Sequence, residues 1–370
     1  MPSPDARDAA HATAWGLLTG GCVLAGIYFG SRHLRDFDPA LVPYAGASVF
    51  SAFGLGYRYS MWLRRPPTRL YWRRGWQLFF APSRVAHNVT RLARLFVLNI
   101  LAQRFIEKRS PLRWTAHAFI FWGCILAAAV TFPLSFGWIH FETAPGSEQL
   151  YRAFVFGLHV FTFPLDSVLA PLVFNVLDIS AGLVLVGIFF AMWRRGRDRG
   201  ALAVQQFADD LLPLAMLFAV SVTGIFLTVS THLMRGVHFV FLSQLHAVTV
   251  IFTLLYLPFG KFFHIFQRPA QLGIAFYREA GERGELARCA ACGGTFAPRM
   301  QVEDLKAVER ELGIRYDGVG LATGRGHYQD VCPSCRRKNL ALVQDRLWRG
   351  ERAAASERVG GPGAQPPDRS

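Results

Sequence analysis

The sequence predicts an all-α integral membrane protein with about six transmembrane helices, followed by a small domain that contains paired cysteines. Hydrophobic residues make up 52% of the 370 residues and the mean hydropathy is +0.25, which is more apolar than expected for a soluble enzyme. Six apolar stretches are candidate spans, and two Cys-x-x-Cys pairs follow the last of them. We expect the spans at 12–30, 41–57, 114–138, 172–193, 211–230 and 239–264.

The first two spans fall within 1–70, and a basic segment at 71–113 follows them. Residues 57–113 hold thirteen Lys or Arg and a single acid, so most of the net charge of +15 lies in this one loop. The loops after spans two and four carry seventeen Lys or Arg, against four in the loops after spans one, three and five. The positive-inside rule then places both termini in the cytoplasm, with the chain in the inner (plasma) membrane of the cell. Charge confined in this way argues against nucleic-acid binding.

The basic segment has the pattern of an amphipathic helix on the inner leaflet, because leucines and phenylalanines at helical spacing alternate with arginines. Alternatively it docks a partner subunit, and the two roles are compatible. At the N-terminus we expect no cleaved signal peptide, because the flank has mixed charge (Asp5, Arg7 and Asp8).

Residues 114–268 form the predicted four-helix membrane domain, with an apolar stretch at 151–165 along its surface. His117 lies near the cytoplasmic start of the third span, and His264 near the cytoplasmic end of the sixth. Two neutral imidazoles at matching depth on different helices can fill both axial positions of a b-type haem. His246 stands eighteen residues before His264, about five helical turns, so we expect one helix to present both from the same face, with His246 near the outer end. The alternative is that these histidines are structural, although ionisable residues within spans are more often functional.

Three segments carry a resemblance to a known family. "LHAVTVIFTLLYLPFGKFFHIFQRP" (245–269) resembles the last haem-bearing helix of the gamma subunit of respiratory nitrate reductases and of the membrane cytochrome b of heterodisulfide reductases. "RWTAHAFIFWG" (113–123) is similar to the first haem helix of that family, and "SVTGIF" (221–226) to the intervening helix. The resemblance covers about residues 85–270. It implies a cytochrome that oxidises quinol and passes electrons to a cytoplasmic iron–sulfur partner.

The resemblance pairs His117 with His264 and leaves His246 alone. The family has a second histidine ten residues after the first, where this chain has Ala127. We expect His159 to replace it, with His140 and His232 as other candidates near the outer face. One or two b haems are therefore expected, and a site with a single protein ligand remains an alternative.

Three acids are candidates for contact with quinol or for proton release: Asp178 inside the fourth span, and Asp166 and Glu142 near the outer boundary. Each could instead cap a helix or pair with a neighbouring residue. Lys261 and Arg268 flank His264 and could bind haem propionates, or extend to the lipid interface.

After Pro269 the composition becomes charged and rich in glycine, and we expect a cytoplasmic metal-binding module at 280–348. Its cysteines form two Cys-x-x-Cys pairs with 39 residues between them, which is typical of a tetrahedral thiolate site. These are Cys289 and Cys292, then Cys332 and Cys335. "CAACGGTFAP" followed by "CPSC" resembles the knuckles of rubredoxins and zinc ribbons, so the metal is zinc or iron, and we favour zinc. Residues 351–370 are expected to form a disordered tail.

Two functions follow from these patterns. The first is a membrane cytochrome b subunit that oxidises quinol and donates electrons to a cytoplasmic iron–sulfur or molybdopterin reductase. The second is a membrane transporter or scaffold with a zinc-ribbon docking domain and no haem. We see no internal repeat and no paired broken helices, which disfavours a transporter.

Overall fold

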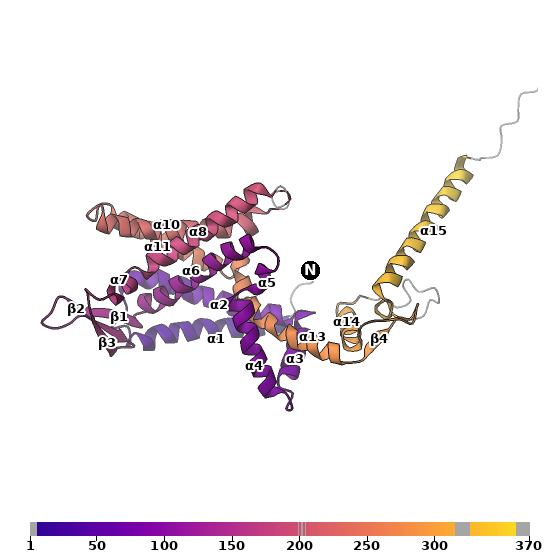
Figure 1. Cartoon of the computed structure of the whole chain (residues 1–370), viewed down its shortest axis with the longest axis horizontal. Helices are drawn as coiled ribbons and strands as arrows, with labels where there is room; N and C mark the ends of the chain where they lie inside the picture. Colours follow the sequence, from indigo (N-terminus) through magenta and orange to yellow (C-terminus); the bar gives the residue numbers. More distant parts are fainter. Residues whose placement is uncertain (1–5, 199, 201–202, 204, 315–325, 360–370) are drawn as a thin grey trace, which may run out of the picture. The chain divides into compact units, whose positions relative to one another are not determined.

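The computed structural model describes residues 6–198, 200, 203, 205–314 and 326–359, and this part of the chain is mostly helical (Figure 1). The chain divides into two units. The first, here the membrane unit, comprises Met1–Arg64 and Ala86–Leu272; the second, here the cysteine unit, comprises Arg65–Val85 and Gly273–Ser370. The division differs from the expected one, because the basic segment 71–113 is shared between the two units.

Six helices of the described residues are long and apolar enough to cross a membrane, which confirms the predicted number of spans. They are α1 (Ala6–Gly30), α2 (Val42–Arg64), α6 (Pro111–Ser135), α8 (Val176–Arg197), α10 (Leu212–His232) and α11 (Phe239–Tyr256). A 3-10 turn (Pro39–Leu41) precedes α2, and a π-helical turn (Phe207–Leu211) precedes α10. Large apolar side chains such as Phe29, Phe189 and Phe252 point outward from these helices, as expected where lipid is the solvent.

The membrane unit contains a ring of five helices. Along the ring, α6 packs against α8, α8 against α10, α10 against α11, and α11 against α2, while α1 packs on the outside of α2. Tyr44 of α2 closes the ring of helices, because its side chain contacts Phe132 of α6 and Phe136 directly after α6, at centroid distances of 6.1 and 5.9 Å. Helix α6, which carries His117, and helix α11, which leads to His264, are therefore both part of the ring.

Close packing of α6 on α8 depends on two glycines. A Cβ added at Gly123 of α6 would lie 2.8 Å from the carbonyl oxygen of Ser180, and one added at Gly187 of α8 would lie 2.8 Å from that of Ala116. Small residues let two membrane helices approach until their backbones touch. The second of these contacts is one residue from His117, so it fixes the depth of that histidine.

A three-stranded antiparallel sheet interrupts the helical pattern, so the protein is not all-α. Its strands are β1 (Ile139–Thr143), β2 (Leu150–Val155) and β3 (Leu158–Pro164), in the order β1-β2-β3. Phe156 and Gly157 form the β2–β3 turn, with φ of 50° and 76°, which is the pattern of a two-residue hairpin turn. Phe163 of β3 and Ala170 of α7 (Leu169–Phe174) are buried together. The apolar stretch 151–165 is thus part of a sheet at one end of the bundle (Figure 1).

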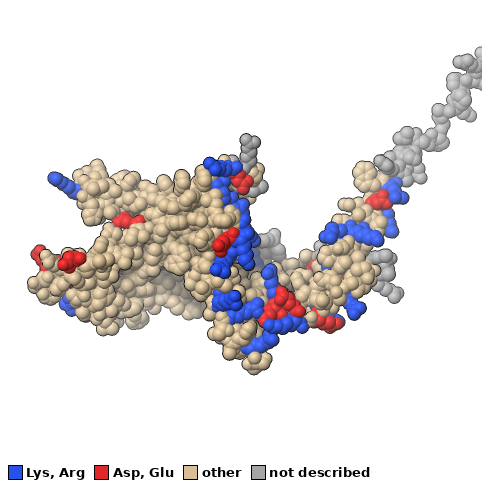
Figure 2. Space-filling model, viewed as in Figure 1, with Lys and Arg blue, Asp and Glu red and all other residues tan. Residues whose placement is uncertain are grey.

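The opposite end of the bundle carries the basic side chains. Here lie α4 (Val85–Phe96), a π-helical turn (Val97–Leu101) and α5 (Arg104–Glu107). Figure 2 shows that Lys and Arg gather at this end, while the flank of the spanning helices is almost free of charge. The orientation predicted from the sequence depends on this concentration of Lys and Arg at one end of the bundle.

The sixth span is shorter than expected, because α11 ends at Tyr256, eight residues before His264. Pro258 has no backbone N–H to continue the helix and disfavours helical geometry in the residue before it. A 3-10 turn (Lys261–Phe263), α12 (His264–Ala270) and a second 3-10 turn (Gln271–Gly273) follow. His246 and His264 therefore lie on two helices, and the expectation that one helix presents both from the same face is wrong.

The cysteine unit packs a segment from the first basic loop against the C-terminal part of the chain. Its elements are α3 (Thr68–Phe79), α13 (Ile274–Arg283), β4 (Leu286–Arg288), β5 (Thr295–Pro298), α14 (Arg299–Glu311), a 3-10 turn (Tyr328–Asp330) and α15 (Pro333–Val359). Asp304 of α14, which is 5% exposed, accepts hydrogen bonds from Arg74 of α3 at 3.0 Å and from the Tyr277 hydroxyl of α13 at 2.8 Å. Burial and this carboxylate raise the pKa of Tyr277.

The expected disordered tail is only partly described. Helix α15 continues to Val359, so the first residues of the segment 351–370 are helical. Residues 360–370 lie outside the described residues.

Candidate functional site

The structure brings His117 and His264 together. The first is the seventh residue of α6, nearly two turns from its start, and the second is the first residue of α12. Their ring centroids are 6.3 Å apart, with 67° between the ring planes. A metal shared by two imidazoles sets the ring centres about 6 Å apart, given a metal–nitrogen bond of about 2 Å and about 1 Å from that nitrogen to the ring centre. The spacing of this histidine pair therefore fits one iron atom between the rings.

Hydrogen bonds fix which nitrogen of each ring is available. The Nδ1 of His117 lies 2.8 Å from the side-chain oxygen of Gln103, and the Nδ1 of His264 lies 2.5 Å from the carbonyl oxygen of Lys261. Because both partners are acceptors, both Nδ1 atoms carry the proton and both Nε2 atoms keep a lone pair for a ligand. Histidines that bind metals usually have this arrangement.

The surroundings of His264 favour its neutral form, the form in which an imidazole can bind a metal. Burial lowers its pKa, and the positive charges of Arg268 and Lys261 act in the same direction, against the hydrogen bond to the Lys261 carbonyl. Lys261 itself pairs with Asp210 at 2.7 Å, and the Arg268 guanidinium lies 5.0 Å from the centre of the Phe105 ring. Both cations that the sequence placed beside His264 are therefore near it.

Gln103 is a functional candidate that sequence reasoning missed. It lies between the π-helical turn and α5, in the left-handed region with φ of 52°, and is only 2% exposed. The indole N–H of Trp114 anchors this turn by donating to the carbonyl of Ala102 at 2.8 Å. The side-chain nitrogen of Gln103 is buried and has no hydrogen-bond partner among the described residues. A polar residue within an apolar run was the available signal, but its neighbour His117 is fourteen residues away in sequence.

Arg58 is a second residue that the sequence did not single out. From α2 its guanidinium donates to the carbonyl oxygens of Pro258 at 2.5 Å and Gly260 at 3.4 Å, and it lies 4.3 Å from the centre of the Phe263 ring. The break after α11 leaves these carbonyls without helical partners. Arg58 therefore holds the turn that leads to His264.

His246 is not paired with another histidine. Its Nδ1 lies 2.9 Å from the hydroxyl of Thr223 on α10, and no ring contact joins it to a second histidine within the described ranges. His159, the expected partner, lies on β3 with an exposed side chain whose Nε2 is 2.9 Å from the Thr162 hydroxyl. The structure therefore does not bring His159 to His246.

The three acids lie in different places. Asp178 is in the first turn of α8, where the Thr228 hydroxyl of α10 donates to it at 2.8 Å. Asp166 is exposed in the turn after β3. Glu142 is exposed on β1, 3.6 Å from the Nε2 of His140. Asp178 alone of the three is part of a spanning helix, and so it is the best placed to meet a ligand inside the bilayer.

The four cysteines converge in the cysteine unit. Cys289 and Cys292 lie in the β4–β5 turn, while Cys332 and Cys335 lie at the start of α15. Their four sulfur atoms are all within 4.8 Å of one another. A tetrahedral thiolate site with metal–sulfur bonds of about 2.3 Å places its sulfurs about 3.8 Å apart, so small shifts would close the cluster around zinc or iron.

Local backbone geometry prepares this cluster for a cation. Burial raises the pKa of the Cys289 thiol, but backbone N–H groups lower it to about 6; among them, that of Cys332 donates to its sulfur at 3.2 Å. Gly293, with φ of 72°, provides the tight turn after the first pair. Phe296 packs on the buried cysteines, as expected from the knuckle pattern.

The chain matches no family model, no curated protein and no solved structure.

Proposed function

We propose that this protein is the membrane cytochrome b subunit of a respiratory or redox complex, which oxidises quinol and passes electrons to a cytoplasmic iron–sulfur or molybdopterin reductase. The observation that carries the proposal is the histidine pair: two rings 6.3 Å apart, each with its Nδ1 hydrogen-bonded outward. A purely structural role for the two histidines would not require both Nε2 lone pairs to lack a hydrogen-bond donor among the described residues.

Each residue around the pair has a distinct role in this proposal. His117 and His264 would hold a b-type haem through their Nε2 atoms, and the haem would supply reversible one-electron transfer. Gln103 and the carbonyl of Lys261 keep the rings in the required tautomer. Arg58 fixes the turn before His264, and the contact of Gly187 with Ala116 fixes the depth of His117.

Asp178 is the proposed proton acceptor for quinol. A quinol releases two protons with its two electrons, and a carboxylate at the end of a spanning helix can take one of them to water. Asp178 lies at the end of α8 opposite to the arginines of its last turn. Under the proposed topology, with both termini in the cytoplasm, that end faces outward and the proton leaves on the outer side.

The cysteine unit would bind the soluble partner or pass electrons to it. Zinc in the four-cysteine cluster would make it a structural module, and iron would make it an electron relay. Zinc is our choice, because four thiolates with backbone support form the closed site typical of structural zinc.

Absorption spectroscopy of the full-length protein in purified membranes tests the proposal. We expect reduced-minus-oxidised Soret and alpha bands of b type, which a quinone analogue perturbs. His264→Ala should remove the bands that belong to this pair. The matched variant His11→Ala, at an exposed position on α1, should keep them.

Haem content gives the second readout. Pyridine haemochrome analysis should give one haem per chain for the described pair, and a second haem would require a ligand for His246 from elsewhere. Wild-type membranes without b-type bands would contradict the proposal and favour the transporter or scaffold alternative.

A further inference from the structure

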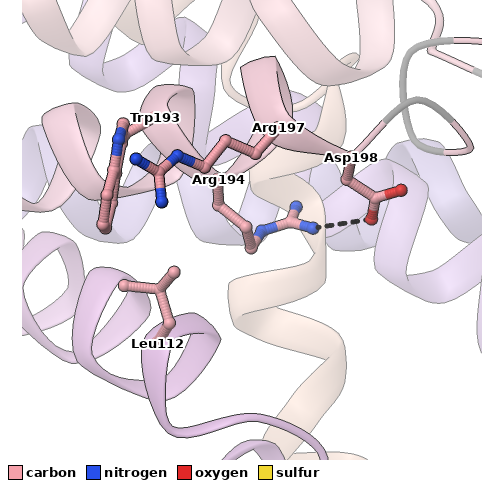
Figure 3. Close-up of a pocket in the computed structure, with 5 residues that line it drawn as sticks. All are labelled: Leu112, Trp193, Arg194, Arg197 and Asp198. Carbon is pink, nitrogen blue, oxygen red and sulfur yellow. Dashed lines mark ion pairs between the residues drawn. The ribbon is translucent and has the colours of Figure 1, made fainter.

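A cavity of about 510 Å³ opens where α6 begins and α8 ends (Figure 3). Leu112 of α6 forms one wall, and the last turn of α8 forms the other with Trp193, Arg194 and Arg197, followed by Asp198. The proposed redox chemistry uses none of these five side chains. They belong to the ends of two spanning helices, which is the level where a bilayer changes from hydrocarbon to headgroups.

The two arginines keep N–H donors that their contacts with described residues do not use. The Arg197 guanidinium lies 4.3 Å from the centre of the Trp193 ring, a contact that uses its face and leaves its N–H edge open. Arg194 lies 3.6 Å from Asp198, which is longer than a hydrogen bond. In Figure 3 the Arg197 guanidinium lies beside the Trp193 ring, and the Arg194 guanidinium points toward Asp198. By contrast, the neighbouring Arg195 points to Asp210 of the π-helical turn at 3.7 Å.

The cavity combines a cationic and an apolar half. Among the described residues that line it, two guanidinium groups against one carboxylate give a net positive charge, while Leu112 and the Trp193 ring offer apolar surface. Guanidinium groups bind phosphate oxygens in a two-pronged geometry, and tryptophan prefers the headgroup level of a membrane. A ligand that satisfies both halves has an anionic phosphate attached to a hydrocarbon part.

We propose that this cavity binds the phosphodiester headgroup of an anionic phospholipid from the arginine-rich leaflet. Arg194 and Arg197 take the phosphate oxygens, and the glycerol backbone lies on Trp193 and Leu112. Basic cavities between spanning helices are suited to such headgroups. The site is independent of the histidine pair, and so the inference does not rest on the proposed function.

Native mass spectrometry of the full-length protein tests the site, with dioleoylphosphatidylglycerol and dioleoylphosphatidylcholine as probes. Wild-type protein should retain the anionic lipid preferentially. An arginine near an anionic lipid headgroup contributes about 1 kcal/mol, or about fivefold in affinity. Arg194→Gln with Arg197→Gln should therefore weaken retention of phosphatidylglycerol about 25-fold and leave phosphatidylcholine unchanged. Asp198→Asn removes the carboxylate among the described lining residues and should strengthen retention of phosphatidylglycerol.

Matched controls separate this cavity from general surface charge and from free phosphate. Arg109→Gln removes an exposed arginine at the same end of the bundle and should leave retention of phosphatidylglycerol unchanged. The melting temperature without lipid should be equal for all variants, which shows that they fold. Equal retention of phosphatidylglycerol by the double variant and wild type would overturn the proposal. It would also be overturned if inorganic phosphate at the same concentration stabilised the protein as much as the lipid does.

Discussion

The hydrogen bond from His117 to Gln103 makes a sharp prediction about ligand binding. In the wild-type protein the Nδ1 of His117 lies 2.8 Å from the amide oxygen of Gln103. In Gln103→Asn the side chain is one methylene shorter and cannot reach that nitrogen. Asparagine tolerates the left-handed backbone at φ of 52°, so the change does not add strain. The Nδ1 proton is then left buried without an acceptor, which costs about 1–3 kcal/mol. We expect haem to be retained about 10- to 100-fold less tightly, because the ring is free to rotate or change tautomer.

Gln103→Glu is the complementary change. The carboxylate keeps the acceptor and removes the buried amide nitrogen that has no partner among the described residues. A negative acceptor makes the imidazole a stronger donor to iron, so the midpoint potential should fall while haem is retained. Potentiometric titration of the alpha band measures the potential, and the melting temperature of the haem-free protein controls for folding. If Gln103→Asn binds haem as tightly as wild type and Gln103→Glu has an unchanged potential, the role given to Gln103 is refuted.

Three further predictions concern the turn before His264 and the cysteine unit. Arg58→Met removes the guanidinium that binds the carbonyl of Pro258, and should lower haem content while all six spans still insert; unchanged haem content would contradict this role. Tyr277→Phe removes the hydroxyl that donates to Asp304, and denaturant unfolding should show a loss of about 1 kcal/mol in the cysteine unit; no change would show that water replaces the bond. Elemental analysis should find one zinc per chain, lost progressively as the pH falls because protons compete with the metal for thiolates; retention of the metal at acidic pH after dialysis against a chelator would argue against thiolate ligation.

The spanning helices could be predicted because the composition of about twenty consecutive residues is enough to identify each one. No knowledge of tertiary contacts is needed. The meeting of His117 and His264 was also predictable, since topology alone places them at the same depth. The four-cysteine cluster followed from spacing. These features depend on local sequence or on the geometry of a bilayer.

The sheet was missed because a short apolar run has no period that separates a strand from a helix. In 151–165 the decisive signal was the turn Phe156–Gly157, which needs positive φ at both positions and contains only one glycine. The end of α11 was missed for the opposite reason. Pro258 marked it, but a proline inside a long apolar run can also kink a helix that continues.

The roles of Gln103 and Arg58 could not be predicted, because they arise from contacts between segments distant in sequence. Arg58 reaches a carbonyl two hundred residues later in the chain. In the sequence Arg58 is one of thirteen basic residues in 57–113, and the orientation of the protein in the membrane is enough to explain that positive charge. Only tertiary structure distinguishes an arginine that binds backbone from one that faces water.

The cysteine unit is discontinuous, and this has a consequence for biosynthesis. Phe79, the last residue of α3, leaves the ribosome nearly two hundred residues before Ile274, the first of α13, against which α3 packs. During that interval four spans must enter the membrane. Until Phe276 has been synthesised, the apolar side of α3, including Phe79, lacks the ring that it contacts in the folded cysteine unit. A protein truncated after the last span would therefore contain α3 without α13, and the aromatic side chains of α3 would be exposed. Such a truncated protein would be unsuitable for studying the membrane unit by itself.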